Sequence, residues 1–212
     1  MQVIPTINEK SFEEIKKKVA LIENRVNWIQ FDIADGKFTS YTTWNNPSDL
    51  LTLNPSLNFE IHLMIAEPEK AVEEWFKIPN VKRVIVHLET INENSFNQIL
   101  ALAKNYQKEI GLAIESKTPW ENIIPYANKI DLVQVLAVSA GPAGQIFEPS
   151  NLEKIKNIKK NFPYLKIAVD GGVNDKTAPL IKKAGADIIN SSSYIFSDLS
   201  KVEEKIKLLE NI

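Results

Sequence analysis

The amino-acid sequence predicts an α/β protein of the (β/α)8 class, a TIM barrel formed as a single domain by residues 1–212. Short strand-like runs alternate with helical runs eight times, which favours parallel strand pairing. Divided among eight units, the 212 residues leave about 26 for each. That length accommodates a strand, a helix and their loops but no large insertion. No linker-like stretch divides the chain.

Strands are predicted where β-branched and aromatic residues cluster between turn signals. The first strand runs into Pro5-Thr6-Ile7-Asn8-Glu9, which contains no glycine. An open doubly wound sheet is the alternative fold, but it would place a Gly-rich turn at this point. In chain order the predicted strands are Gln2–Ile7, Trp28–Ile33, Phe59–Ile65, Arg83–Leu88, Ile110–Ile114, Leu132–Val138, Lys166–Val169 and Asp187–Asn190.

Helices are predicted between the strands, where apolar residues recur every three or four positions. Ser11 opens a capping pattern, a serine followed three residues later by Glu or Gln, and the pattern recurs at Ser95, Ser150 and Ser200. Gly185 stands where a helix should end. In chain order the predicted helices are Phe12–Asn24, Ser48–Leu53, Glu69–Phe76, Ser95–Gln107, Pro119–Tyr126, Leu152–Asn161, Ala178–Ala184 and Leu199–Leu209.

Composition and charge narrow the classes of function. The chain is 44% hydrophobic and 25% charged, which is ordinary for a soluble domain with a sizeable core. Its net charge of -2 provides no general attraction for nucleic acid or anionic membranes. The absence of cysteine excludes disulfides and thiolate zinc sites. No apolar run of membrane length and no signal-peptide pattern occurs. We therefore expect a cytoplasmic protein without nucleic-acid or membrane partners.

Polar side chains stand near the ends of several predicted strands. Gln30 and Asp32 lie two residues apart, so they share one face of their strand. A hydrogen-bonded pair in the core would be the simplest explanation of these two. However, His62, His87 and Asp170 hold equivalent positions in three other strands. Because barrel strands end at one mouth, where active sites form, we expect these side chains to converge there. Glycines also fall just beyond strand ends, at Gly36, Gly141, Gly144, Gly171 and Gly172.

Four motifs resemble those of the ribulose-phosphate 3-epimerase family, and they follow in that family's order over nearly the whole chain. Each motif is short, and Asp-Gly-Gly alone is common in turns, so the resemblance rests on the set. It implies a barrel of the ribulose-phosphate-binding type. The motifs are Asp32-Ile33-Ala34-Asp35-Gly36, His62-Leu63-Met64 followed by Glu67-Pro68, Val138–Phe147, and Val169-Asp170-Gly171-Gly172.

The resemblance implies an isomerase of pentose phosphate metabolism. Such an enzyme removes the C3 proton of a phosphorylated ketopentose on one face and returns a proton on the other through an enediolate. By motif position, Asp32 and Asp170 would be the acid and base. A divalent metal ion (Mn, Mg, Fe or Zn) would stabilise the enediolate. Its ligand positions are Gln30, Asp32, His62 and Asp170.

The resemblance also implies a phosphate site formed by main-chain NH groups. We expect a homo-oligomer, although no stretch of the sequence identifies an interface. The implied substrate contacts are Glu9, Met64, Gly141, Gly144, Gly171, Gly172, Ser192 and Ser193.

Several residues depart from the family pattern. Gln30 stands where the family has a histidine, and an amide is a poorer zinc ligand than an imidazole. The metal ion should therefore be harder, such as Mg or Mn, and held more weakly. Glu9 adds a negative charge where the family has a serine beside an anionic substrate. Two alternatives stay open: a decarboxylase or lyase acting on another phosphorylated ligand, and a non-catalytic epimerase-like binding protein. The other departures are Lys37, Glu115, Ala140 and Ser192.

Overall fold

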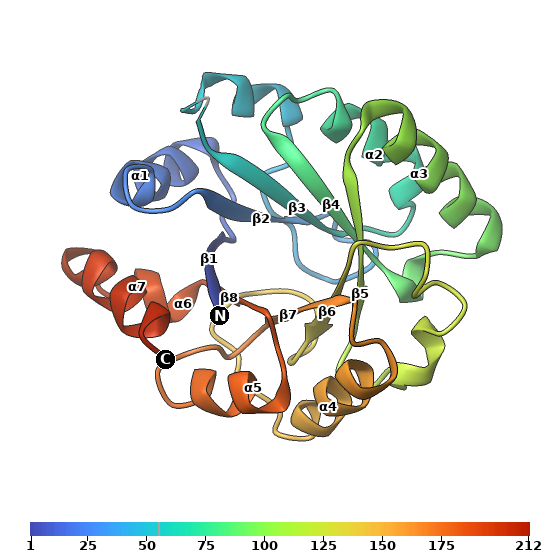
Figure 1. Ribbon diagram of the computed structural model, residues 1–212. Coiled ribbons are helices and arrows are strands. Elements are labelled where there is room, and N and C mark those ends of the chain that lie inside the picture. The colour runs from blue at the N-terminus through green and yellow to red at the C-terminus, as the bar shows by residue number, and fades with distance from the viewer. Residues whose placement is uncertain (55) are drawn as a thin grey trace.

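The computed structural model describes residues 1–54 and 56–212, and it is a closed barrel of eight parallel strands surrounded by helices (Figure 1). Each strand pairs with the next one along the chain, and β8 pairs with β1 to close the ring. The predicted fold class and all eight predicted strands are confirmed. The strands are β1 (Gln2–Ile7), β2 (Trp28–Ala34), β3 (Asn58–Met64), β4 (Val81–His87), β5 (Glu109–Ile114), β6 (Leu132–Leu136), β7 (Lys166–Asp170) and β8 (Ile188–Ser191).

Helices and short 3-10 turns connect the strands and lie outside the ring (Figure 1). Within the part of the chain that the structure describes, none of the helices combines the length and apolar character needed to cross a membrane. The helices are α1 (Phe12–Ile22), α2 (Pro68–Phe76), α3 (Glu93–Tyr106), α4 (Asn151–Asn161), α5 (Ala178–Ala184), α6 (Ser193–Phe196) and α7 (Val202–Glu210). The 3-10 turns are η1 (Pro47–Thr52), η2 (Leu88–Thr90), η3 (Trp120–Ile123) and η4 (Leu199–Lys201).

Two of the predicted helices are wrong, because Ser48–Leu53 and Pro119–Tyr126 form only the 3-10 turns η1 and η3. Pro125 lies inside the second range, and a proline there removes a helical hydrogen bond and clashes with the preceding turn. In η1 the only buried residue is Leu50. So little buried apolar surface cannot stabilise an α-helix of six residues.

The predicted helix starts are correct in one case and displaced in others. Ser11 caps α1 as expected, since its Oγ accepts a hydrogen bond from the amide of Glu14. In α3 the cap is instead Asn92, and Ser95 completes a capping box by accepting a hydrogen bond from the Asn92 amide at 2.9 Å. Ser150 makes no capping bond with its side chain, and Ser200 lies within η4.

The inside of the barrel is layered because successive side chains of a strand alternate between its interior and its helix-covered exterior. One interior layer is an apolar cluster of Ile4, Ile85, Ala113, Leu132, Ala168 and Ile188. Two residues further along five of these strands, the next inward positions are all polar: Thr6, His87, Gln134, Asp170 and Asn190. A polar layer therefore lies directly above an apolar one, toward the C-terminal ends of the strands.

Candidate active site

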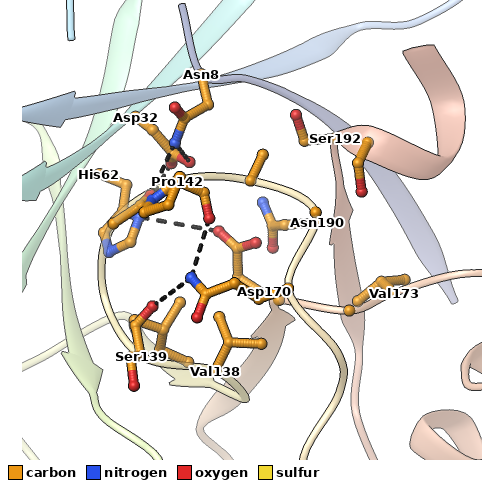
Figure 2. Close-up of a pocket in the computed structure, with 18 of the residues that line it drawn as sticks. Asn8, Asp32, His62, Val138, Ser139, Pro142, Asp170, Val173, Asn190 and Ser192 are labelled. Carbon is orange, nitrogen blue, oxygen red and sulfur yellow. Dashed lines mark hydrogen bonds and ion pairs between the residues drawn. The ribbon is translucent and has the colours of Figure 1, made fainter. Parts of the chain in front are cut away.

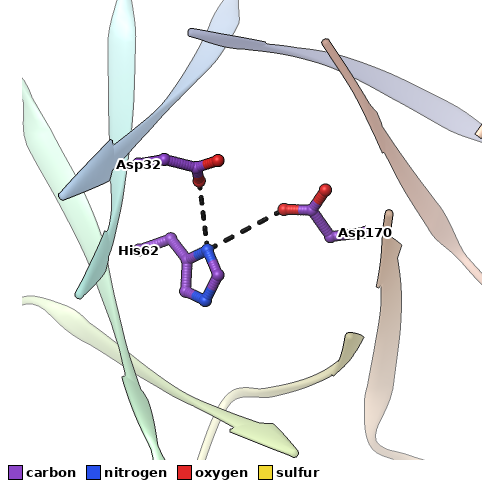
Figure 3. A group of neighbouring side chains, drawn as sticks. All are labelled: Asp32, His62 and Asp170. Atoms are coloured by element: carbon purple, nitrogen blue, oxygen red, sulfur yellow. Dashed lines mark hydrogen bonds and ion pairs between the residues drawn. The ribbon is translucent and has the colours of Figure 1, made fainter. Parts of the chain in front are cut away.

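Asp32, His62 and Asp170 meet at the C-terminal mouth of the barrel (Figure 3). Asp32 and His62 are register partners on β2 and β3, while Asp170 ends β7. Each of the three buried residues offers a ligand atom, and these atoms lie within 4.8 Å of one another. His62 Nδ1 is 3.0 Å from Asp32 Oδ1 and 3.8 Å from Asp170 Oδ2. The predicted convergence of these three residues is confirmed.

Gln30 lies between the two carboxylates and holds them together. Its Nε2 donates to Asp32 Oδ1 at 2.9 Å and to Asp170 Oδ2 at 2.6 Å. Its Oε1 accepts a hydrogen bond from Asn190 Nδ2 at 2.8 Å. This orientation follows from charge, because an amide oxygen turned toward two carboxylate oxygens would be repelled. The donor group of Gln30, rather than its oxygen, therefore faces the site.

A buried network beneath Gln30 fixes this orientation. Asn190 Nδ2 also donates to Glu60 Oε1 at 2.6 Å, and Glu60 pairs with Arg83 at 2.7 Å. Burial raises the pKa of Glu60, although the positive charge of Arg83 opposes this. Because Asn190 has its donor committed to two oxygens, it supports only the arrangement in which Gln30 presents its NH2 group to the aspartates.

The two aspartates are not equivalent. Burial, with the nearby charge of Asp32, raises the pKa of Asp170 to about 7. Asp170 Oδ2 accepts from Gln30 and, at 3.4 Å, from Gln134, while no described residue donates to its Oδ1. Both oxygens of Asp32 are occupied, since Oδ1 accepts from Gln30 and Oδ2 accepts from Asn8. Asp170 thus keeps an oxygen free to exchange a proton near neutral pH.

A chain of side chains runs from Asp32 through His62 and His87 to Glu89. The Nε2 atoms of the two imidazoles are 2.9 Å apart, and His87 Nδ1 is 3.3 Å from Glu89 Oε2. Burial lowers the pKa of His87 to about 4. Burial also acts to lower the pKa of His62, but the hydrogen bond and charge of Asp32 raise it overall. A protonated His62 that donates from both nitrogens to Asp32 and to a neutral His87 satisfies every contact.

The aspartates and His62 fit a divalent cation, since two carboxylates and one imidazole within 4.8 Å can share one ion. Gln30 fits less well as the fourth ligand. Its oxygen is bonded to Asn190, and its NH2 group occupies the space between the carboxylates. An ion that used all four positions would require the Gln30 amide to turn over and its bond to Asn190 to break.

A cavity of about 450 Å³, including its open mouth, lies above these residues (Figure 2). Ten of the predicted site residues line it: Asp32, His62, Met64, Gly141, Gly144, Asp170, Gly171, Gly172, Ser192 and Ser193. Glu9 and Gln30 do not line it. Glu9 instead pairs with Lys18 of α1 at 2.5 Å. This placement does not support the expected contact between Glu9 and substrate.

Strand alternation explains why Asn8, and not Glu9, reaches the cavity. Ile4 and Thr6 point into the barrel, so the next inward position is residue 8, while residue 9 faces the helices. Asn8 was missed because the family resemblance directed attention to residue 9. Asn190 and Gln134 were missed as well, although each lies two residues after an apolar interior residue and could have been identified by that spacing. Glu60 was also missed, although it lies two residues before His62 on the same strand.

Two further departures from the family pattern lie outside the carboxylate cluster. Glu115 Oε1 accepts a hydrogen bond from the amide of Ala140 at 3.3 Å, so it anchors the loop after β6. Lys37 is exposed and does not line the cavity.

Gly172 makes a close approach that excludes any side chain. Its φ is 66°, and a Cβ atom added there would lie 2.2 Å from the backbone nitrogen of Phe147. We expect Gly172→Ala to lower the free energy of unfolding by about 1–3 kcal/mol, measured by denaturant titration. Gly144→Ala is the control, since Gly144 also has a positive φ but its Cβ would meet nothing closer than 3.9 Å. Equal losses in the two variants would contradict a steric origin.

Comparison with protein families and with curated proteins finds related sequences. A model of the ribulose-phosphate 3 epimerase family matches residues 2–196. The ribulose-phosphate 3-epimerase of Schizosaccharomyces pombe is 28% identical over 216 residues, covering 99% of this chain and 92% of that protein. The one from Chlamydia pneumoniae is 33% identical over 192 residues, covering 86% of this chain and 82% of that protein. The one from Bacillus subtilis is 30% identical, covering 98% of each.

Solved structures share the barrel. The 3-hexulose-6-phosphate synthase of Salmonella typhimurium has a TM-score of 0.77 at 13% identity, covering 100% of this chain and 97% of that one. The 3-keto-L-gulonate-6-phosphate decarboxylase of Vibrio cholerae has a TM-score of 0.74 at 7% identity, covering 99% of this chain and 95% of that one. At such identities the likeness shows the fold alone.

Proposed function

Because the chain belongs to the ribulose-phosphate 3-epimerase family, we propose that it interconverts ribulose 5-phosphate and its C3 epimer, xylulose 5-phosphate. Family membership confirms the class of enzyme expected from the motifs, an epimerase acting on carbohydrates. The single observation that carries the reaction is the pair of buried carboxylates, Asp32 and Asp170, at one barrel mouth. Inversion at carbon requires one group to take a proton and a second to return one to the opposite face.

In the proposed reaction one carboxylate removes the proton from C3, and the electron pair of the C–H bond moves into the C2 carbonyl to form an enediolate. The other aspartate, in its protonated form, then delivers a proton to the opposite face of C3, and the carbonyl re-forms. The pKa of Asp170, about 7, supports this role because such a group exchanges protons readily near neutral pH.

The enediolate adds negative charge between two carboxylates, so the site must supply positive charge or hydrogen-bond donors. The NH2 group of Gln30 and a protonated His62 are the donors of this chain that face that region. We propose that Asp32, His62 and Asp170 can instead hold a divalent metal ion, with His62 deprotonated at its ligating nitrogen, and that the ion when bound would stabilise the negative oxygens as a Lewis acid.

We propose that the phosphate lies against the main chain of Gly171 and Gly172 and beside Ser192 and Ser193, with Gly141 to Gly144 opposite. The presence of these small residues in the lining of the cavity supports this, because residues with little or no side chain let a ligand approach main-chain NH groups. Met64 would contact the apolar side of the sugar. The expected homo-oligomer and cytoplasmic location remain predictions.

Incubation with ribulose 5-phosphate in deuterated water tests the reaction. We expect xylulose 5-phosphate to appear together with deuterium at C3, both followed by nuclear magnetic resonance. The double variant Asp32→Asn, Asp170→Asn is the control and should show neither. Binding of the sugar phosphate without exchange would favour the non-catalytic alternative. Release of carbon dioxide or cleavage of a carbon–carbon bond from another sugar phosphate would favour the decarboxylase or lyase.

The raised pKa of Asp170 predicts a pH dependence. Epimerisation in either direction needs the two aspartates to share one proton, so that one is a base while the other is an acid. The pKa of about 7 means that Asp170 holds this proton below pH 7 and loses it above. We expect kcat/KM of the metal-depleted protein in both directions to fall as pH rises through about 7, by about tenfold per pH unit. A rate that keeps rising from pH 7 to 9 would contradict this assignment.

A further inference from the structure

We propose that Asn8, the residue that follows β1, positions Asp32 for proton transfer and ties it to the loop over the cavity. This inference rests on the proposed epimerase function. Asn8 is only 7% exposed and lines the cavity beside Asp32. Figure 2 shows its amide nitrogen directed at the Asp32 carboxylate. We call residues 138–147 the mouth loop, since it follows β6 and covers the cavity.

Asn8 makes two hydrogen bonds with one amide group. Its Nδ2 donates to Asp32 Oδ2 at 2.9 Å and to the carbonyl oxygen of Gly141 in the mouth loop at 3.2 Å. The Gly141 carbonyl can only accept, and so can Asp32 when it is ionised, so the orientation of the amide is determined and both of its hydrogens are used. Among the hydrogen bonds of residues 1–54 and 56–212, no other side chain joins a catalytic carboxylate to this loop.

The contact from Asn8 completes the set of donors around Asp32. Gln30 and His62 contact Oδ1, and Asn8 alone contacts Oδ2 among the described residues. With donors on both oxygens the carboxylate cannot rotate freely. Without Asn8 it could turn about its Cβ–Cγ bond, which would displace the oxygen that exchanges a proton with the substrate. Small displacements of reacting groups slow catalysis strongly.

The remaining atom of the Asn8 amide, Oδ1, is buried without any hydrogen-bond partner among the described residues. A buried acceptor without a partner is costly, so this atom offsets part of the stability that the two hydrogen bonds of Nδ2 provide. Leucine has the same branching at Cγ as asparagine, so Asn8→Leu removes both hydrogen bonds with little change in shape.

The first test compares kcat with KM in Asn8→Leu. We expect kcat for ribulose 5-phosphate to fall about 10- to 100-fold with little change in KM, in a protein that remains folded at the assay temperature. Gln145→Ala is the comparison, because Gln145 Nε2 donates to the carbonyl oxygens of Ser139 and Pro142 within the mouth loop but does not contact Asp32. It should mainly raise KM. An unchanged kcat in folded Asn8→Leu, or a fall in kcat/KM that comes from KM alone, would overturn the positioning role.

The second test asks whether Asn8 affects proton exchange by Asp32 or by Asp170. In Asp170→Asn only Asp32 can exchange the C3 proton with deuterium, and in Asp32→Asn only Asp170 can. At saturating substrate, adding Asn8→Leu should slow exchange at least about tenfold more in the first background than in the second. Equal slowing in both would overturn the inference while the proposed function stands. A wild-type protein that exchanges no proton of either epimer would overturn the proposed function and this inference together.

Discussion

Replacing Asp170 by asparagine is expected to reduce epimerisation by at least about a thousandfold. The carboxamide has nearly the same size but cannot take up a proton, and Asp170 carries the free oxygen and the raised pKa of the site. Turnover of ribulose 5-phosphate and of xylulose 5-phosphate should both be lost, because each direction uses both aspartates. The rate is measured by following either sugar phosphate by nuclear magnetic resonance.

Asp170→Asn should lose epimerisation but keep proton exchange with one of the two epimers. Asp32 can still remove the proton of one epimer, so that epimer alone should exchange with deuterated water without inverting. In Asp32→Asn the opposite epimer should exchange. Asp175→Asn is a matched control, since Asp175 is an exposed aspartate shortly after β7 that does not line the cavity. Asp175→Asn should retain full activity. Retained epimerisation in Asp170→Asn would remove this residue from the mechanism.

Replacing Gln30 by histidine is expected to tighten metal binding at least about 100-fold, because even the outer partners of metal ligands change affinity by about 10- to 100-fold. The imidazole adds a nitrogen ligand and removes the NH2 group that now lies between the carboxylates. Preference should also move toward zinc, whereas the native ligand set, which is richer in oxygen, should discriminate less strongly between zinc and manganese. Titration calorimetry of metal-depleted protein with each ion measures both effects.

A Gln30→Met variant separates two effects on metal affinity, the gain of an imidazole ligand and the loss of the NH2 group. Methionine is as long as glutamine, so it removes the NH2 group from between the carboxylates without supplying an imidazole. If the new ligand is what matters, Gln30→His should bind zinc far more tightly than Gln30→Met. Equal affinities would mean that residue 30 is not a ligand. In the native protein, added manganese should raise activity more than added zinc, and a zinc ion that survives chelation would contradict the expected preference.

The barrel and the convergence of Asp32, His62 and Asp170 could both be predicted from the amino-acid sequence. Alternating strand and helix patterns of about 26 residues predict parallel pairing, and the ends of parallel strands share one mouth. That geometry brings Asp32, His62 and Asp170 together although they are 30 to 138 residues apart in the chain. The prediction that a helix ends at Gly185 is also correct. Gly185 ends α5 with a φ of 108°, a conformation that glycine readily adopts.

The orientation of side-chain amides and the pKa values in the site depend on the tertiary structure and could not be predicted from local sequence patterns. The orientation of the Gln30 amide depends on Asn190, which lies 160 residues away and selects its oxygen. The pKa of Asp170 depends on burial and on Asp32, both of which exist only in the closed barrel. In both cases the deciding contact joins strands distant in sequence, so hydrogen-bond direction, burial and charge are set by packing and not by residue type.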